Sequence, residues 1–150
     1  MCREHGQQLM QLAAKDNSLE GFELFGIIKE TAVDDEGLTE FYNKYFPFPI
    51  YRDVDLKFYQ ALGDGKISDS FSYNPIRIFK SFREIGKRIK EKDLEGNYVG
   101  EGLKTGGVII FGANGDPKYM AVEQTGTALD EEALLAAVKA VRDMSITVEL

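Results

Sequence analysis

Hydrophobic residues recur along this chain in two patterns: a three-to-four-residue spacing typical of helices, and short continuous runs typical of buried strands. The first helical pattern begins at Cys2 and ends at the polar residues 16–18. The apolar run 22–28 follows, and its β-branched and aromatic residues predict a buried strand. The apolar face of the first helix comprises Leu9, Leu12 and Ala13.

A second helix and a second strand are predicted next. Acidic residues 34–36 favour the start of this helix, which ends near Tyr45 because prolines follow it. Residues 50–52 predict a short strand. The predicted apolar face of the helix comprises Leu38, Phe41, Tyr42 and Tyr45.

A third helix is expected over residues 53–62. Asp53 and Asp55 are interpreted as its N-terminal caps rather than as a catalytic pair, and Gly63 ends it. Helices and strands thus alternate along the first half of the chain. This alternation predicts an α/β fold in which helices cover a sheet.

A further helix, predicted over residues 75–92, carries an unusual local charge. Its seven basic residues outnumber two acidic ones in a chain that is otherwise acidic. Such a helix can dock on anionic lipid or an acidic partner, draw in a carboxylate substrate, or simply form a solvated face. The basic residues are Arg77, Lys80, Arg83, Lys87, Arg88, Lys90 and Lys92.

Five glycines follow this helix: Gly96, Gly100, Gly102, Gly106 and Gly107. Their spacing does not match the dinucleotide fingerprint, and Lys104 lacks the preceding glycine of a P-loop, so nucleotide binding is not predicted. We instead expect a loop with unusual backbone angles and a close approach of main chain to another group.

The chain ends with a predicted β-hairpin and a helix. Residues 108–111 and 119–123 form the two strands around a turn rich in glycine. The last helix begins at the acidic residues 130–132. Residues 145–150 are interpreted as a C-terminal tail, which leaves one domain over residues 1–144. The apolar face of the last helix comprises Leu134, Leu135, Val138 and Val141.

The composition fits one soluble globular domain. A chain of 150 residues with 43% hydrophobic and 29% charged residues can bury a single core, and it has no apolar run of membrane-spanning length. The net charge of −7 argues against binding to nucleic acid. The single cysteine excludes an internal disulfide and a multi-cysteine zinc site. We therefore expect a cytoplasmic protein without a bound metal.

Cys2, at the start of the first predicted helix, is the candidate catalytic residue. The free N–H groups and the dipole at a helix N-terminus favour the thiolate, which is the reactive form of cysteine. Arg3 adds positive charge, and His5 falls on the same helical face, so both are candidate thiolate-stabilising residues. The alternative is a small, unreactive core cysteine.

Several short motifs extend this picture. Met1-Cys2-Arg3-Glu4 precedes the first helix, Ile50-Tyr51-Arg52-Asp53 leads to Leu62-Gly63, and Leu94-Glu95-Gly96 precedes the glycines that lead into Val108. In these motifs the chain resembles the peroxiredoxin-like 2 family, within the alkyl hydroperoxide reductase and thiol-specific antioxidant (AhpC/TSA) group. The resemblance implies a thioredoxin-like mixed sheet flanked by helices, with a helical insertion before the C-terminal hairpin.

The resemblance also gives Cys2 a narrower role. It matches the second, resolving cysteine of a Cys-x-x-Cys pair whose first member would precede Met1. The strand that should precede the first helix is absent as well, so Met1 is interpreted as an internal residue of a longer protein. We therefore expect a central gap or an exposed edge in the sheet, which would favour a homo-oligomer. Thr105, Gly106 and Gly107 form a candidate active-site loop with its backbone near Cys2.

Two functions remain open. The first is a thiol-dependent antioxidant oxidoreductase that reduces peroxide or endoperoxide-like substrates. Its reducing equivalents would come from a thiol reductant protein such as thioredoxin, or from glutathione, without a bound cofactor. This function predicts that Cys2 titrates below the ordinary thiol value and is alkylated quickly at neutral pH. The second is a catalytically inactive thioredoxin-like module that binds a partner through the basic helix or an exposed sheet edge.

Overall fold

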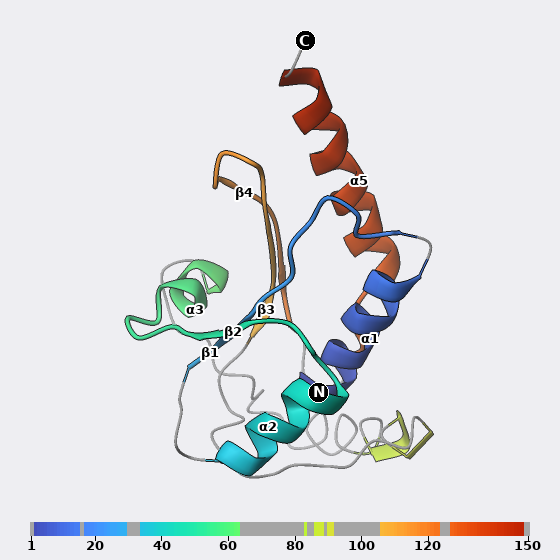
Figure 1. The fold of residues 1–150 in the computed structure, drawn as a ribbon, viewed down its shortest axis with the longest axis vertical. Helices are drawn as coiled ribbons and strands as arrows, with labels where there is room; N and C mark the ends of the chain where they lie inside the picture. Colours follow the sequence, from blue (N-terminus) through green and yellow to red (C-terminus); the bar gives the residue numbers. More distant parts are fainter. Residues whose placement is uncertain are drawn as a thin grey trace.

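The computed structural model alternates helices and strands in the predicted order, which confirms the α/β class (Figure 1). It describes residues 2–15, 17–29, 34–63, 83, 86–88, 90–91, 106–123 and 127–148. The elements are α1 (Cys2–Ala14), β1 (Gly26–Ile28), α2 (Asp35–Lys44), β2 (Ile50–Arg52), α3 (Lys57–Leu62), β3 (Gly107–Phe111), β4 (Pro117–Val122) and α5 (Glu131–Val148).

The described strands form two separate pairs. β1 and β2 run parallel, with Gly26 opposite Ile50. β3 and β4 form the predicted antiparallel hairpin, with Gly107 opposite Val122 and a register irregularity between Ile110 and Phe111. The expected gap or exposed edge in the sheet stays a prediction, since these two sheets comprise only the described strands.

The main core lies between α1, α5 and the hairpin. Figure 1 shows the upper end of α1 meeting the lower end of α5, and each helix turns one apolar stripe inward. Leu9, Ala13 and Leu135 pack against this core, so the predicted faces of the first and last helices are confirmed. The buried residues of the core are Leu12, Leu19, Ile110, Leu134, Val138 and Val141.

α3 contacts the hairpin on its other face. Alternate residues of a strand point to opposite faces, so β3 can pack on both sides. The rings of Phe58 and Phe111 meet edge to face, with their centroids 6.3 Å apart. A Cβ on Gly107 would lie 3.0 Å from Leu62 Cδ2 and would overlap the carbonyl oxygen of Ala121. The expected close main-chain approach at the end of the glycine-bearing loop is therefore present.

α2 packs against the start of α1. Its N-cap Asp34 accepts a hydrogen bond from the Gly37 backbone N–H at 2.9 Å. A Cβ on Gly6 of α1 would lie 2.9 Å from Phe41 Cε2 and 3.2 Å from the carbonyl oxygen of Tyr45. A glycine at this position therefore allows the two helices to touch.

Two predictions about the first strand and second helix are wrong in part. The strand expected over residues 22–28 is only Gly26–Ile28, because its partner β2 is three residues long. It is half-buried rather than buried. Tyr42 was expected to face the core but is 46% exposed. Phe41 and Tyr45, four residues apart, define the inward face of the helix, and Tyr42 lies about 100° away from Phe41.

α3 begins at Lys57, later than predicted. Asp53 still caps it, because its Oδ1 accepts a hydrogen bond from the Lys57 N–H at 3.0 Å and its Oδ2 from the Phe58 N–H at 2.8 Å. Asp55 instead pairs with the Lys57 side chain at the surface, at 3.2 Å. The cap prediction is therefore confirmed for Asp53 and wrong for Asp55.

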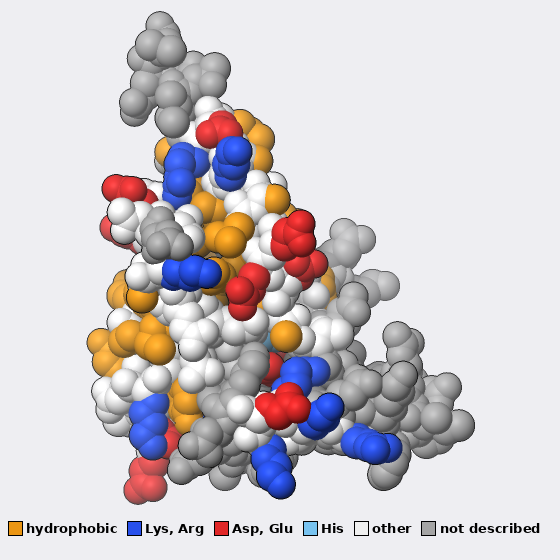
Figure 2. All heavy atoms as spheres, turned by 90° about the vertical axis from the view of Figure 1, so that its right-hand side faces the viewer, with side chains coloured by type: hydrophobic (Ala, Val, Ile, Leu, Met, Phe, Trp, Pro, Cys, Tyr) orange, Lys and Arg blue, Asp and Glu red, His pale blue; other side chains and the backbone are white. Residues whose placement is uncertain are grey.

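The predicted basic helix is helical at every described position between residues 83 and 91. The remainder of residues 75–92 lies outside the described residues, and so do Gly96, Gly100 and Gly102. Basic and acidic side chains are interspersed on the face shown in Figure 2. Residues 145–148, predicted as a tail, continue α5. Within the described ranges, no helix is long and apolar enough to cross a membrane.

Candidate thiol site

Cys2 is the first residue of α1 and is exposed to solvent. The next three residues each make a polar or charged contact with a different part of the molecule. Arg3 binds Glu40, Glu4 binds Arg88, and His5 lies near Glu123. Helix ends fray when they depend on their own hydrogen bonds. These three contacts therefore fix the position of the first turn, and of Cys2 with it.

The pKa of the Cys2 thiol is raised, which contradicts the predicted thiolate. Protein atoms crowd the sulfur although the residue reaches solvent, and this desolvation is the largest cause of the raised pKa. The negative charge of Glu123 is the second cause. The backbone N–H of Cys2 opposes both without outweighing them. Position at a helix start is therefore not sufficient to ionise this thiol.

Arg3 holds α1 against α2. Its Nη2 donates to Glu40 Oε2 at 2.5 Å, and its guanidinium carbon lies 5.2 Å from the ring centroid of Tyr45. Glu40 also accepts from Lys44 at 2.8 Å. The positive charge of Arg3 is thus paired with Glu40, and the stabilisation of a Cys2 thiolate by Arg3 stays a prediction.

Glu4 is buried, with its side chain 1% exposed, and Arg88 Nε donates to its Oε1 at 3.1 Å. A buried carboxylate requires such a partner, because the loss of hydration is otherwise too costly. The pair connects the first turn of α1 with the basic helix. Arg88 is therefore used inside the molecule rather than as a docking charge.

His5 is placed between Glu123 and Thr127. Its Nδ1 lies 3.9 Å from Glu123 Oε1, and its Nε2 lies 3.4 Å from the carbonyl oxygen of Thr127. The side chains of His5 and Glu123 are 17% and 16% exposed. His5 was predicted to lie on the same helical face as Cys2. Its nearest charged group is the Glu123 carboxylate, so its predicted role toward the thiol stays a prediction.

Tyr59 of α3 also belongs to the electrostatic surroundings of Cys2. The pKa of Tyr59 is raised, first by desolvation and then by the charges of Cys2, Asp53 and Glu123. A backbone hydrogen bond at Lys29 acts against this shift. These groups come from α1, the segment before α3, α3 itself and the end of β4. The site is therefore assembled from distant parts of the chain.

The predicted active-site loop is described at two of its three positions. Thr105 lies outside the described residues. The Gly106 carbonyl oxygen accepts from the Glu123 backbone N–H at 2.9 Å, and Gly107 begins β3. Since the charge of Glu123 is one cause of the raised pKa of Cys2, the backbone of Gly106 pairs with a residue that influences the thiol.

Sequence reasoning missed Glu123 and Tyr59. Neither residue belongs to a sequence motif. Tyr59 in α3 and Glu123 after β4 are far apart in the sequence, and only tertiary packing brings these two elements together. A usable signal was available for Glu123. It is the last residue of the predicted hairpin, and the register places it opposite Gly106.

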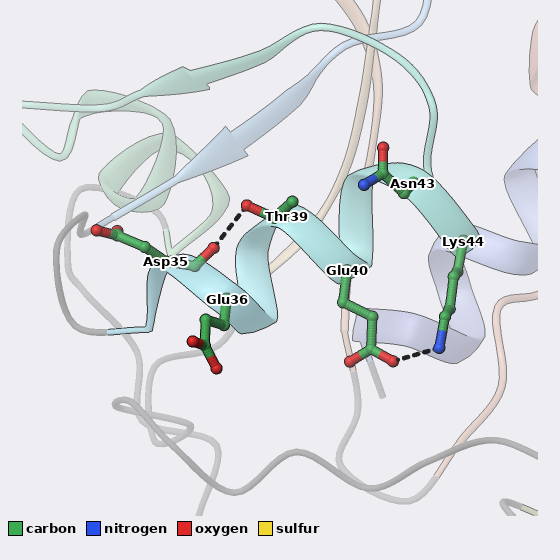
Figure 3. Close-up of a pocket in the computed structure, with 6 residues that line it drawn as sticks. All are labelled: Asp35, Glu36, Thr39, Glu40, Asn43 and Lys44. Atoms are coloured by element: carbon green, nitrogen blue, oxygen red, sulfur yellow. Dashed lines mark hydrogen bonds and ion pairs between the residues drawn. The ribbon is translucent and has the colours of Figure 1, made fainter.

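A shallow depression follows one surface of α2 (Figure 3). Its polar groups already bind one another: the Thr39 hydroxyl donates to the Asp35 carbonyl at 2.8 Å, and Lys44 binds Glu40. We do not assign a ligand to it. In the described part of the chain, no group of three or more His, Cys, Asp or Glu is arranged to hold a metal ion. The lining residues are Asp35, Glu36, Thr39, Glu40, Asn43 and Lys44.

An exposed cysteine at a helix start, a parallel strand pair, and a β-hairpin followed by a helix are consistent with a thioredoxin-like fold. The family model for AhpC/TSA antioxidant enzymes matches residues 8–125, and the chain belongs to this family. The match begins after Cys2, Arg3 and His5. It therefore supports the fold and a thioredoxin-like redox role, but not the roles of those residues.

Curated relatives are prostamide/prostaglandin F synthases. The Sus scrofa protein is 31% identical over 104 residues, which cover 67% of this chain and 51% of the relative. The Homo sapiens protein is 31% identical over 117 residues, covering 77% and 56%, and the Salmo salar protein is 27% identical over 149 residues, covering 91% and 72%. The chain thus spans about half the length of the two mammalian proteins. No solved structure gives a significant match.

Proposed function

We propose that this chain is a thiol-dependent antioxidant oxidoreductase, or the main part of one, with Cys2 at the resolving position. The observation that carries the proposal is an exposed cysteine at the start of α1 in a chain of the AhpC/TSA family. A resolving cysteine remains a thiol until another sulfur has been oxidised. The raised pKa of Cys2 favours the thiol form and is therefore compatible with that role. The names of the relatives favour endoperoxide-like substrates in addition to simple peroxides.

With a peroxide and an external thiol, Cys2 alone supports a one-cysteine cycle. The thiolate attacks one peroxide oxygen, the O–O bond breaks, and the products are a sulfenic acid and, after protonation, an alcohol or water. One external thiol condenses with the sulfenic acid, releases water and leaves a mixed disulfide. A second thiol then regenerates Cys2 and forms the external disulfide. Thioredoxin or glutathione supplies the two electrons, so the cycle needs no bound cofactor.

Peroxide consumption in the presence of thioredoxin or glutathione tests this function, with Cys2→Ser as the matched variant. We expect slow turnover at pH 7 that depends on Cys2 and rises toward pH 9, because the thiolate fraction increases. Equal consumption by the wild type and by Cys2→Ser would overturn the proposal.

The alternative function, a binding module without turnover, is favoured by one observation. Lys87 on the basic helix is 77% exposed, although it pairs with Glu91 at 3.7 Å. Replacing both Lys87 and Arg83 by glutamate should then abolish cosedimentation with vesicles that contain phosphatidylserine, while Cys2→Ser leaves it intact. Arg88 is unsuitable for this test because its replacement would disturb Glu4. Unchanged cosedimentation of the double variant would exclude this surface.

A homo-oligomer formed through a sheet edge is a further proposal from the same alternative. The two described strand pairs each have edges, and an edge strand can pair with another chain. Light scattering over a concentration series tests it. A monomer at all concentrations would rule out this mode of association.

A further inference from the structure

Leu56, the residue directly before α3, has a strained backbone. Its φ of 56° and ψ of 29° lie in the left-handed region, where the Cβ of most residues approaches the following carbonyl oxygen too closely. The other described residues with a positive φ are Asn17, Gly21 and Gly115, whose types enter this region more easily. Among the described residues, Leu56 is therefore the one that adopts this conformation against the preference of its type.

α3 has few interactions that offset this strain. It is six residues long, none of them is buried, and the Leu56 side chain does not cap it. Its start depends on Asp53, whose carboxylate accepts from the N–H groups of Lys57 at 3.0 Å and Phe58 at 2.8 Å. The Asp53 backbone N–H in turn donates to the Ile28 carbonyl oxygen at 2.8 Å. One residue thus fixes the start of α3 to the end of β1.

α3 covers part of one face of the β-hairpin, which we call the outer face. Val108, Ile110 and Tyr119 point into the main core, so the residues that alternate with them point to the outer face. Phe58 of α3 meets the Phe111 ring, and Leu62 lies against Gly107. Met120 and Val122 on this face are 51% and 47% exposed, so the cover is incomplete. The outer face comprises Gly107, Ile109, Phe111, Met120 and Val122.

We propose that α3 is a movable cover: it opens as one unit about residues 53–56, before the rest of the molecule unfolds, and uncovers the outer face of the hairpin. Opening relieves the strain at Leu56, because the leucine can then return to an ordinary backbone conformation. The contacts that opening breaks are few: the two bonds to Asp53, the ring contact of Phe58, the packing of Leu62 and a backbone hydrogen bond of Tyr59 at Lys29. Segments with so little burial open locally at low cost.

Hydrogen exchange of the full chain, followed residue by residue by NMR, tests whether α3 opens separately. The N–H groups of Gln60 and Gly63 bond to carbonyl oxygens four residues earlier, at 2.9 and 3.2 Å, and so report on α3. We expect them to be protected to a similar degree, and by a factor roughly tenfold or more below that of Val138 in the core helix α5. Equal protection of α3 and Val138 would overturn the proposal.

Substitutions of Leu56 test whether its backbone strain drives the opening. Leu56→Gly and Leu56→Asn should raise the protection of α3 by roughly threefold or more, because both types tolerate the left-handed region. Leu56→Val should lower it, because a β-branched residue fits this region poorly. Val138 should keep its wild-type protection in all three variants. Lower protection in both Leu56→Gly and Leu56→Asn would contradict the proposal, because the leucine side chain would then stabilise the closed form.

Thiol labelling tests whether opening uncovers the outer face. In a Cys2→Ser background, Ile109→Cys places a thiol between the two contacts that α3 makes with β3. Its labelling by N-ethylmaleimide should slow by roughly threefold when Leu56→Gly is added. Met120→Cys, on the same face but 51% exposed, is the matched control, and its labelling rate should not change. An unchanged rate at position 109, or an equal change at both positions, would show that α3 is not the cover. None of these measurements requires Cys2, so their outcome is independent of the proposed function.

Discussion

The two ends of α1 are held by different interactions. In the first turn, Arg3 and Glu4 form ion pairs with α2 and the basic helix, and His5 lies near Glu123, the residue after β4. Further along, Leu12 is 5% exposed and packs in the apolar core with α5. Gln8 lies between these regions, where its side chain donates to Glu131 at 2.8 Å.

The two ends of α1 therefore contribute differently: one to the stability of the fold, the other to the orientation of Cys2. Apolar burial is non-directional and contributes in proportion to the area removed from water, so the Leu12 end stabilises the fold without fixing any one atom. Ion pairs require particular geometry and respond to pH and salt. The charged end therefore determines where Cys2 lies and which form its sulfur takes, and substitutions at the two ends should have different consequences.

The largest loss of stability is expected in the apolar core. Leu134→Ala removes a side chain that is 3% exposed, and it should lower the free energy of unfolding by about 3–4 kcal/mol. Urea denaturation measures this loss. Met144→Ala on the same helix, at a position 56% exposed, is the control and should change it by less than about 0.5 kcal/mol. Similar losses for both variants would contradict the position of the core.

Glu4→Gln should have the next largest effect. The substitution keeps the size of the side chain but leaves the Arg88 charge without its buried carboxylate, at an expected cost of about 2–3 kcal/mol. Glu132→Gln, at an exposed position in α5, should be close to neutral. Urea denaturation of Glu4→Gln with a wild-type midpoint would show that the pair does not stabilise the first turn.

Hydrophobic periodicity predicted most of the fold because helices and strands bury their faces locally. The apolar faces around Leu12 and Leu134 and the hairpin that contains Ile110 follow directly from spacing. Asp53 was predicted as a cap because aspartate is a preferred residue before a helix, although the same preference led to the wrong prediction for Asp55. The length of β1 could not be predicted, because it depends on how much of the chain its partner supplies.

The chemistry of the site was less predictable. Helix position alone suggested an ionised Cys2, whereas crowding of the sulfur and the charge of Glu123 determine the outcome. Both are tertiary effects, since Glu123 is separated from Cys2 by most of the chain. Arg3 shows the same limit, because its nearness in sequence to Cys2 did not reveal that Glu40 binds it.

Gly6→Ala tests the contact between the charged end of α1 and α2. The new methyl group would lie 2.9 Å from the Phe41 ring, at a cost of about 2 kcal/mol, while alanine gains about 1 kcal/mol of helix propensity. We expect a net loss of about 1 kcal/mol in thermal or urea denaturation. Gly86→Ala is the matched control, because no atom lies within 4 Å of the added Cβ and only the propensity gain remains. Stabilisation by both substitutions would mean that α1 and α2 are not in close contact.

The smallest effect is a change in how stability depends on pH. The pKa values of Cys2 and Tyr59 are raised above their ordinary 9.0 and 10.0, so above about pH 9 the folded protein retains protons that the unfolded chain has released. Stability is then fully present below pH 9 and falls as the pH rises through the folded pKa values. Cys2→Ser combined with Tyr59→Phe should flatten this decline in urea denaturation between pH 8 and about pH 11. Leu134→Ala should lower the whole curve without changing its slope, because this substitution in α5 removes no titrating group. An unchanged slope in the double variant would mean that Cys2 and Tyr59 do not cause this pH dependence of stability.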